Sequence, residues 1–276
     1  HISDGMCASE RELGLGDSHD GIILLRDYGF TPEEYEALKP GDDAMHLLHL
    51  DQPILEINVT PDRGYAFSYR GIAREFHNST GAEFTDPVGE LNAHVPQIEE
   101  QAADTTHDID VIIDDENPIH GVVGCDRFYT RAVHGYDATS KTPNWMRRRL
   151  TRAGMRSLTL PVDVTNYVML DLGQPMHAYD LDKIEGPIVV RRARAGETLT
   201  TLDGKDHDLD PEDLLITDSP NGEQGSRILG IAGVMGGEYG EVTSETTNIL
   251  LEAAHFDPIS VARSSRRHKI PSEAAR

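Results

Sequence analysis

The chain has 276 residues, 38% of them apolar, and its 48 acidic and 25 basic side chains give a formal charge of -23. This length and apolar content are enough for about two compact units with real cores. No apolar run is long enough to cross a membrane, and the first residues lack the pattern of a secretory signal, so we expect a cytoplasmic protein. Cys7 and Cys125 lie far apart without a CxxC spacing, which argues against a disulfide framework or a zinc site.

Positive charge gathers in three short stretches, although the acidic total weakens a nucleic-acid function. These stretches are "RRRLTRAGMR", "VVRRARAG" and "ARSSRRHK". A solvated helix face is the ordinary explanation of each, and contact with RNA phosphates is the alternative. The candidates for phosphate contact are Arg147, Arg148, Arg191, Arg192, Arg266 and Arg267.

The N-terminal third contains recognisable element signals. Residues 1–28 carry scattered glycines and end in an apolar run, which is typical of the tail of a domain. Thr31 followed by Pro32 and acids predicts a helix over 31–38. Alternating apolar and polar residues predict a strand over 54–60, and an amphipathic pattern predicts a helix over 68–81 with a glycine stop.

The remainder mixes strands and helices. Residues 84–118 are acidic and show little periodicity, so we expect a connector and the main domain boundary there. From Asp126 a second unit begins, in which strands and helices do not alternate regularly, and this favours an α+β fold over a doubly wound sheet. The expected elements are a strand at 127–136, helices at 142–155 and 165–173, and short strands near 187–193, 197–204, 214–218, 228–237 and 247–256.

Several common chemistries lack their motifs. The sequence has no GxxxxGK[ST] phosphate loop, and the glycines of "GIAGVMGGEYG" do not match the dinucleotide fingerprint. HExxH and GxSxG are absent, and the 13 histidines do not cluster at metal-ligand spacing. Conventional hydrolases and metalloenzymes therefore lose support, and we expect no metal site.

Two features leave alternatives open. The glycines around Ala232 indicate either tight packing of a strand and turn or the wall of a ligand pocket. Glu252 lies between apolar residues and alanines, so it is either an edge residue facing water or a buried acceptor that needs a donor.

Five long motifs carry a resemblance to a known family. They are "GMCASERELGL", "INVTPDRGYAFSYRGIARE", "PVDVTNYVMLDLGQPMHAYDLDKI", "LGIAGVMGGEYGEVTSETTNILLEAAHFDP" and "SRRHKIPSEAAR". In this order they closely resemble the β subunit of bacterial phenylalanyl-tRNA synthetase over nearly the whole chain. The resemblance implies a fragment of that subunit.

The resemblance implies a division of the chain. Residues 1–28 correspond to the tail of an OB-type tRNA-binding insertion, and residues 29–118 to a small α/β domain of the B1 type with its connector. Residues 119–276 correspond to a larger, mixed α+β B3/B4 editing domain. ATP and magnesium belong to the intact synthetase, and we expect no cofactor in this fragment.

The family edits by hydrolysing the ester of mischarged tyrosyl-tRNA(Phe), and its substrate pocket maps onto this sequence. Glu252 corresponds to the glutamate that accepts the phenolic hydroxyl of tyrosine. Ala232 and Gly233 form the wall beside the ring, and Ala274 keeps the pocket open. Ser272 stands where threonine is common, so the hydroxyl is retained.

The same resemblance places Thr165, Asn166 and His177 around the scissile ester. A neutral imidazole with an ordinary pKa is able to activate or orient a water molecule. In this family, positioning of water with help from a ribose hydroxyl is the main contribution. A packed histidine satisfied by the backbone is the alternative for His177.

A second hypothesis gives the fragment no activity of its own. It then serves as an assembly module that docks tRNA(Phe) or the α subunit of an α2β2 enzyme. The hydrolase requires Glu252 and the space at Ala274, whereas the docking module depends on the arginine clusters.

Overall fold

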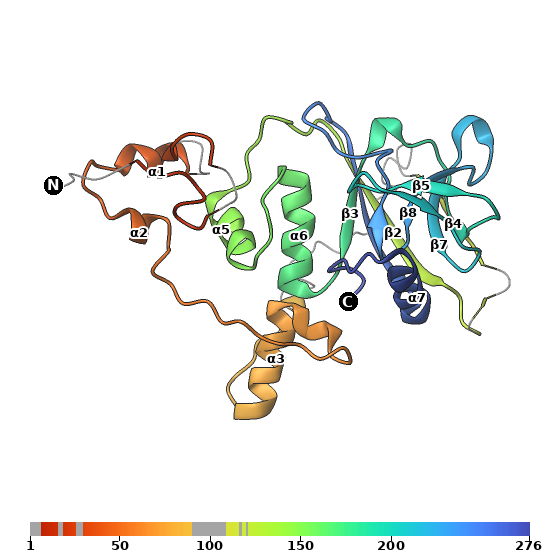
Figure 1. Ribbon diagram of the computed structural model, residues 1–276, viewed down its shortest axis with the longest axis horizontal. Coiled ribbons are helices and arrows are strands. Elements are labelled where there is room, and N and C mark those ends of the chain that lie inside the picture. The colour runs from red at the N-terminus through yellow and green to blue at the C-terminus, as the bar shows by residue number, and fades with distance from the viewer. Residues whose placement is uncertain (1–6, 16–18, 26–29, 90–108, 116–117, 120) are drawn as a thin grey trace. The chain divides into compact units, whose positions relative to one another are not determined.

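The computed structural model describes residues 7–15, 19–25, 30–89, 109–115, 118–119 and 121–276 (Figure 1). The chain divides into two compact units. Unit 1 consists of His1–Asn58 and Thr139–Tyr167, and unit 2 of Val59–Ala138 and Val168–Arg276.

Parts of two predicted segments lie outside the described residues, namely much of the connector at 84–118 and pieces of 1–28. The division into 1–28, 29–118 and 119–276 stays a prediction.

Unit 1 contains short helices. They are α1 (Pro32–Ala37), α2 (Ala44–Leu47), α5 (Asn144–Arg152) and the first part of α6 (Leu160–Leu172). The predicted start of α1 is confirmed, because the Thr31 side chain accepts from the Glu34 backbone N–H while the Glu34 carboxylate accepts from the Thr31 backbone N–H. The helices predicted at 142–155 and 165–173 are present as α5 and α6, and α6 begins five residues earlier than expected.

The strand predicted over 54–60 is wrong. These residues have no strand conformation, and Ile54 and Leu55 are 64% and 83% exposed. Alternation of apolar and polar residues yields a strand only where a neighbouring strand accepts its backbone hydrogen bonds. Within the described residues, no strand pairs with this segment.

Asp163 organises the start of α6. Its carboxylate is fully buried and accepts hydrogen bonds from the hydroxyls of Thr142 and Ser157 and from the backbone N–H of Leu158. A buried carboxylate is tolerated only when several donors satisfy it. This cluster therefore fixes the loop between α5 and α6.

Unit 2 begins with η2 (Gly64–Phe67) and α3 (Tyr69–Thr80). The Ser68 hydroxyl caps α3 by accepting from the Gly71 backbone N–H. Gly81 ends the helix with φ at +73°, a left-handed conformation that glycine adopts without steric cost. The helix predicted over 68–81 is confirmed.

A five-stranded sheet forms one layer of unit 2, with strand order β1-β4-β7-β8-β9. β1 pairs in parallel with β4, and the other pairs are antiparallel. The sequence analysis did not predict β1, which falls inside the expected connector. The strands are β1 (Val111–Asp114), β4 (Ile188–Arg192), β7 (Leu214–Asp218), β8 (Arg227–Ile231) and β9 (Met235–Gly236).

A three-stranded antiparallel sheet of order β2-β10-β3 forms the other layer. Its strands are β2 (Cys125–Val133), β10 (Ile249–Phe256) and β3 (Met176–Asp180). Unit 2 also contains a two-stranded ribbon of β5 (Thr198–Thr200) and β6 (Asp206–Asp208). Its remaining elements are the short helices η4 (Leu181–Lys183) and η5 (Pro220–Gly222) and the helix α7 (Pro258–His268). The mixture of helices with largely antiparallel sheets confirms the predicted α+β class.

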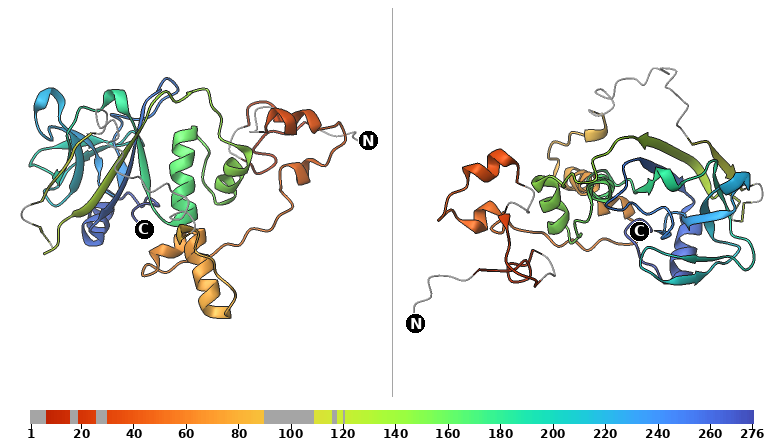
Figure 2. Two further views of the ribbon diagram at one scale, coloured as in Figure 1. Left: turned by 180° about the vertical axis from the view of Figure 1, so that it is seen from behind. Right: turned by 90° about the horizontal axis from the view of Figure 1, so that it is seen from above.

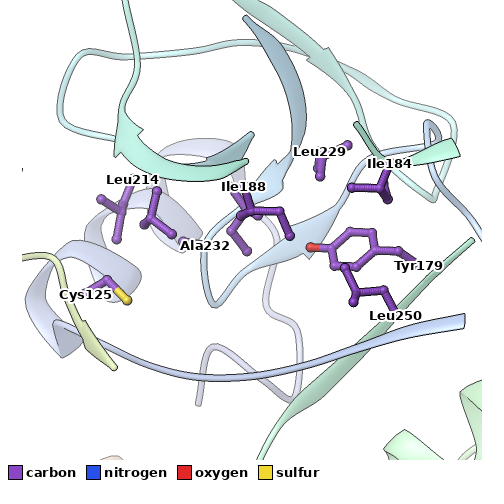
Figure 3. Close-up of a cluster of buried hydrophobic side chains, with 10 residues drawn as sticks. Cys125, Tyr179, Ile184, Ile188, Leu214, Leu229, Ala232 and Leu250 are labelled. Atoms are coloured by element: carbon purple, nitrogen blue, oxygen red, sulfur yellow. The ribbon is translucent and has the colours of Figure 1, made fainter. Parts of the chain in front are cut away.

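The main core lies between the two sheets (Figure 3). Cys125, Tyr179 and Leu250 come from the three-stranded sheet, and they pack with Ile188 and Leu214 of the five-stranded sheet. Because successive residues of a strand face opposite sides, alternate positions of each strand enter this core. Burial of these side chains holds the two layers together.

The opposite face of the five-stranded sheet has its own apolar cluster, which includes Leu215, Ile231 and Ile270. Val261 of α7 packs against this cluster, and Figure 2 shows α7 (dark blue) beside the strands from behind and from above. β7 is thus buried on both faces, which explains why it begins with three consecutive apolar residues, Leu214 to Ile216. In the described part of the chain, no helix has the length and apolar character needed to cross a bilayer.

Asp213 joins α7 to the start of β7. Its side chain is fully buried and accepts from Ser264 Oγ at 2.6 Å, Arg267 Nη1 at 2.6 Å and His268 Nε2 at 2.7 Å. These bonds hold the pKa of Asp213 below its ordinary value, against the opposing effect of burial. The carboxylate therefore stays charged and anchors the end of α7.

Asp213→Ala should lower the free energy of unfolding of the chain by about 2–4 kcal/mol, because the change leaves the buried Ser264 hydroxyl and the His268 ring without the acceptor that they bind. The exposed Asp208 of β6 offers a matched control, and Asp208→Ala should stay within about 0.5 kcal/mol of wild type. Urea unfolding followed by circular dichroism measures both. A loss below about 1 kcal/mol for Asp213→Ala would contradict the anchoring role.

Candidate functional site

Two polar side chains predicted as site residues lie opposite each other on neighbouring strands. His177 of β3 is the register partner of Glu252 of β10, and Tyr179 is the partner of Leu250. Residues two apart on a strand share a face, so all four side chains belong to one face of the three-stranded sheet. Since Tyr179 and Leu250 are in the main core, this is the face that looks toward the five-stranded sheet.

Glu252 is a buried acceptor. It is 6% exposed, and its Oε2 accepts a hydrogen bond from the hydroxyl of Tyr179 at 2.6 Å. Burial raises the pKa of Glu252 to about 7, and the Tyr179 bond opposes part of that rise. Of the two alternatives left open by the sequence, the buried acceptor with a donor is confirmed.

His177 is half-buried beside the same tyrosine. Its ring meets the ring of Tyr179 edge to face, with 4.4 Å between centroids and 75° between planes. Loss of hydration lowers the pKa of His177 to about 4, so the imidazole is neutral at physiological pH. A neutral ring has one donor and one acceptor nitrogen for water or substrate.

The glycines near Ala232 differ in what they contact. A Cβ on Gly236 would lie 2.8 Å from Cε1 and 3.0 Å from Nε2 of His177, so the backbone of β9 lies directly against the imidazole. A Cβ on Gly230 would meet backbone atoms of Met235 and Gly236. Both positions require glycine for close approach, but only Gly236 touches a predicted site residue.

The substrate-binding residues predicted beside Glu252 lie in the same unit. Ala232 is 2% exposed and belongs to the main core with Tyr179. Gly233 has φ at +68°, and a Cβ there would meet Val261 at 2.8 Å and Phe256 at 3.1 Å. Tight packing therefore accounts for Gly233, and its contact with a ligand stays a prediction.

The C-terminal segment that carries Ser272 and Ala274 contacts the turn after β8. Ser272 donates its hydroxyl hydrogen to the backbone oxygen of Val234 at 2.7 Å and accepts from the Ala275 N–H. Ala274 is half-buried in the turn that these bonds form. The turn after β8 and the segment with Ser272 are thus joined directly.

Thr165 and Asn166 lie on α6, in the residues assigned to unit 1, whereas His177 and Glu252 belong to unit 2. The buried Thr165 hydroxyl donates to the Val162 carbonyl of its own helix at 2.8 Å. Asn166 is half-buried. Their role at the ester stays a prediction.

The predicted RNA-contacting arginines differ in their internal partners. Arg191 is 3% exposed and pairs with Glu197 at 2.6 Å, and Arg192 pairs with Asp115 at 3.2 Å. These two guanidinium groups stabilise the five-stranded sheet from within. Ion pairs also join Arg147 to Glu10 and Arg267 to Glu212 and Asp213.

Arg148 and Arg266 differ from the other four candidates. Within the described ranges, neither has an acidic partner at ion-pair distance. Arg148 is half-buried and Arg266 is exposed. Their charge is therefore available for an external anion.

Tyr179 was not predicted from the sequence, and Gly236 was singled out only as one of the glycines around Ala232. The signal for Tyr179 was present in "PMHAYD", because a strand there places residues two apart on one face beside His177. The contact of Gly236 depends on β9, a two-residue strand that periodicity does not detect.

The arrangement combines an acceptor for a hydroxyl group with a neutral imidazole. A buried carboxylate attracts a phenolic or alcoholic O–H, and an uncharged histidine is able to hold a water molecule. Across the described positions, no group of three or more His, Cys, Asp or Glu side chains is arranged to hold a metal ion.

Comparison with known proteins identifies relatives of the whole chain. The family model described as "B3/4 domain" matches residues 124–276. The phenylalanine–tRNA ligase beta subunit of Bifidobacterium longum is 75% identical over all 276 residues, and that of Leifsonia xyli subsp. xyli is 54% identical over the same length. The chain spans 32% and 30% of these two relatives, respectively, so it matches about a third of their length.

One solved structure is also similar. An N-terminal fragment of the phenylalanyl-tRNA synthetase beta subunit from Pyrococcus horikoshii matches with 14% sequence identity and a TM-score of 0.38. The match covers 88% of this chain and 70% of that one.

Because Glu252 is buried, the free energy of unfolding should fall as the pH rises and this side chain loses its proton. The folded pKa of about 7 lies above the ordinary 4.5, so the folded state holds its proton longer than the unfolded state does, and stability falls between these two pH values. Glu252→Gln cannot titrate there. The difference in free energy of unfolding between this variant and wild type should therefore shift in favour of the variant by roughly 2–3 kcal/mol when the pH is raised from 5 to 8.

Chemical denaturation at pH 5, 6, 7 and 8 measures this difference. Glu238→Gln is the matched control, since Glu238 is exposed in the same unit and the change removes no buried carboxylate. Equal pH dependence of Glu252→Gln and wild type would show that Glu252 is hydrated in the folded protein.

Proposed function

Because the chain belongs to the B3/4 domain family and matches phenylalanine–tRNA ligase beta subunits along its whole length, we propose that it hydrolyses the ester of mischarged tyrosyl-tRNA(Phe). The chain would then act as the editing part of a phenylalanine–tRNA ligase.

Such an activity answers a chemical problem of the synthetic site. A pocket for phenylalanine rejects the additional hydroxyl of tyrosine by only about 100-fold. A second site discriminates well if it binds the hydroxyl with a buried polar partner, because phenylalanine leaves that partner unsatisfied. Selective hydrolysis of the tyrosyl ester then removes the error.

The observation that carries the proposal is the hydrogen bond from a phenolic hydroxyl to buried Glu252. Tyr179 presents to Glu252 the same functional group that a tyrosyl ester would present, at 2.6 Å and among apolar side chains. Position 252 is therefore able to accept a phenol without water. Phenylalanine offers no such donor.

His177 supplies the second part of the chemistry. In the proposed step a water oxygen attacks the carbonyl carbon of the ester, the bond to the ribose oxygen breaks, and that oxygen receives a proton. With a pKa of about 4, His177 is too weak a base to remove a proton from water efficiently at neutral pH. We assign it to orienting the water, and the ribose hydroxyl to proton transfer.

The other predicted residues complete the proposal. Ala232 and Gly233 would lie beside the substrate ring, while Ala274 would leave room for it and Ser272 would hold the segment that carries Ala274. This last role is supported by the bond from Ser272 to Val234. The family resemblance assigns Thr165 and Asn166 to the ribose and the ester.

The proposed partners are tRNA(Phe) and the α subunit of the ligase. Arg148 and Arg266 are the better candidates for phosphate contact, because their guanidinium groups have no carboxylate partner within the described part of the chain. ATP and magnesium would serve the synthetic reaction outside this chain. A cytoplasmic location agrees with this role.

Glu252→Gln should lower the preference for the tyrosyl ester over the phenylalanyl ester by roughly 10- to 100-fold, because a neutral amide oxygen accepts a weaker hydrogen bond than a carboxylate does. Single-turnover deacylation of tyrosyl-tRNA(Phe) and phenylalanyl-tRNA(Phe) measures the ratio. Glu238→Gln should retain the wild-type preference. A wild-type chain and a complete ligase that both hydrolyse the two esters equally would contradict the proposal and favour an assembly module.

Gly236→Ala should slow hydrolysis of both esters about 10-fold and leave the preference for tyrosine intact, because the new Cβ displaces the His177 ring and a misplacement of about 1 Å is costly. Gly89→Ala is the control, since a Cβ there has no neighbour within 4 Å. The same deacylation assay applies. An unchanged rate in Gly236→Ala would rule out a role for His177 at the ester.

A further inference from the structure

Tyr179 and Glu252 form a hydrogen bond that crosses the β3–β10 pair diagonally. Glu252 is the register partner of His177, and Tyr179 is two residues further along β3, opposite Leu250. The bond between Tyr179 Oη and Glu252 Oε2 measures 2.6 Å, and both residues are buried. It therefore pulls the carboxylate toward the Tyr179 end of the shared face.

The tyrosine ring is itself held firmly. Tyr179 is 1% exposed and packs among Ile184, Ile188 and Leu250, and Figure 3 shows the ring projecting into this cluster. Its edge-to-face contact with His177 fixes the ring from the side of the imidazole. The hydroxyl consequently has a defined position before any ligand binds.

Glu252 has little else to fix it. Within the described part of the chain, Tyr179 is the one side chain that donates a hydrogen bond to this carboxylate. The other titratable groups that influence the pair are His177 on β3, Cys125 on β2 and Asp218 on β7. Of these groups, only neutral His177 has a nitrogen-bound hydrogen to donate, and among the described residues no hydrogen bond joins it to Glu252.

A carboxylate has two oxygens and about four lone-pair directions, so a second donor remains possible after the first has bound. A glutamate side chain without such a bond would lose its fixed orientation, because three of its torsions rotate. A fixed carboxylate avoids that entropy cost when a ligand arrives. The bond from Tyr179 thus prepares Glu252 for a further O–H donor.

We propose that Tyr179 is a positioning residue for substrate specificity: its hydroxyl holds one oxygen of Glu252 and leaves the carboxylate oriented to accept the phenolic hydroxyl of a tyrosyl ester. This inference rests on the proposed function, and it assigns to the protein's own tyrosine a part in distinguishing tyrosine from phenylalanine.

Tyr179→Phe removes the hydroxyl and keeps the ring. The preference for tyrosyl-tRNA(Phe) over phenylalanyl-tRNA(Phe) should fall about 10-fold, mainly through a higher KM for the tyrosyl ester, because the acceptor is no longer oriented. The missing donor also raises the pKa of Glu252 further, since the Tyr179 bond lowers it in the wild type. The pH at which tyrosine preference is half-maximal should therefore move upward.

Tyr129→Phe is the matched control. Tyr129 lies on β2 of the same sheet and is 67% exposed, so loss of its hydroxyl should change neither the preference nor its pH dependence. Deacylation of both esters is measured from pH 6 to pH 8.5 in the chain and in the complete ligase. Urea unfolding of each variant gives the folded fraction, which scales both rates equally and leaves their ratio unchanged.

The outcomes separate the two ideas. A wild-type preference that Glu252→Gln abolishes and Tyr179→Phe reduces, with the upward pH shift, supports the inference. If Tyr179→Phe leaves the wild-type preference unchanged or increases it, the inference is overturned and the proposed function stands. An increase would show that Tyr179 competes with the substrate for Glu252. Absence of any preference in the wild type overturns the proposed function and the inference together.

Discussion

A hydrogen bond between a buried phenol and a buried carboxylate organises the site. The Tyr179–Glu252 bond requires that β3 and β10 pair in one particular register, because a slip of one residue would turn Glu252 out of the core. The neighbouring His177 ring lies directly against the backbone of Gly236, where a Cβ would come within 2.8 Å of it. Strand register and core packing thus position Tyr179 and Glu252, and Gly236 lies against the neighbouring His177.

The same burial shifts two neighbouring groups in opposite directions. Loss of hydration raises the pKa of Glu252 to about 7 and lowers that of His177 to about 4. At neutral pH the imidazole is uncharged and the carboxyl is near its midpoint. A buried carboxyl that ionises in this pH range attracts a hydroxyl donor. Its burial also lowers the stability of the fold relative to an apolar core. This cost agrees with the proposed role of Glu252 in binding.

The sequence predicted elements well where local signals decide them. Thr31 caps the start of α1 with its side chain, and Gly81 ends α3 with its left-handed backbone. Both helices are present as predicted. Residues 55–60 alternate between apolar and polar side chains, yet a strand needs a partner that the pattern does not reveal. The strand β1 pairs in parallel with β4, which is distant in the chain, and local periodicity carries no information about such pairing. For Glu252 the sequence left two alternatives, an edge residue facing water or a buried acceptor, and the identity of its donor, Tyr179, depends on strand register.

A structure of the protein with a stable tyrosyl-tRNA end mimic, in which an amide replaces the ester to the terminal adenosine, tests the central claim most directly. The decisive quantity is the distance from the ligand's phenolic oxygen to the Glu252 carboxylate. We predict about 2.5–3.0 Å, with the Tyr179 bond retained and the scissile carbonyl near His177. A ligand bound with its phenol away from Glu252, or Glu252 still contacted by Tyr179 alone while the ligand occupies another place, would contradict the account.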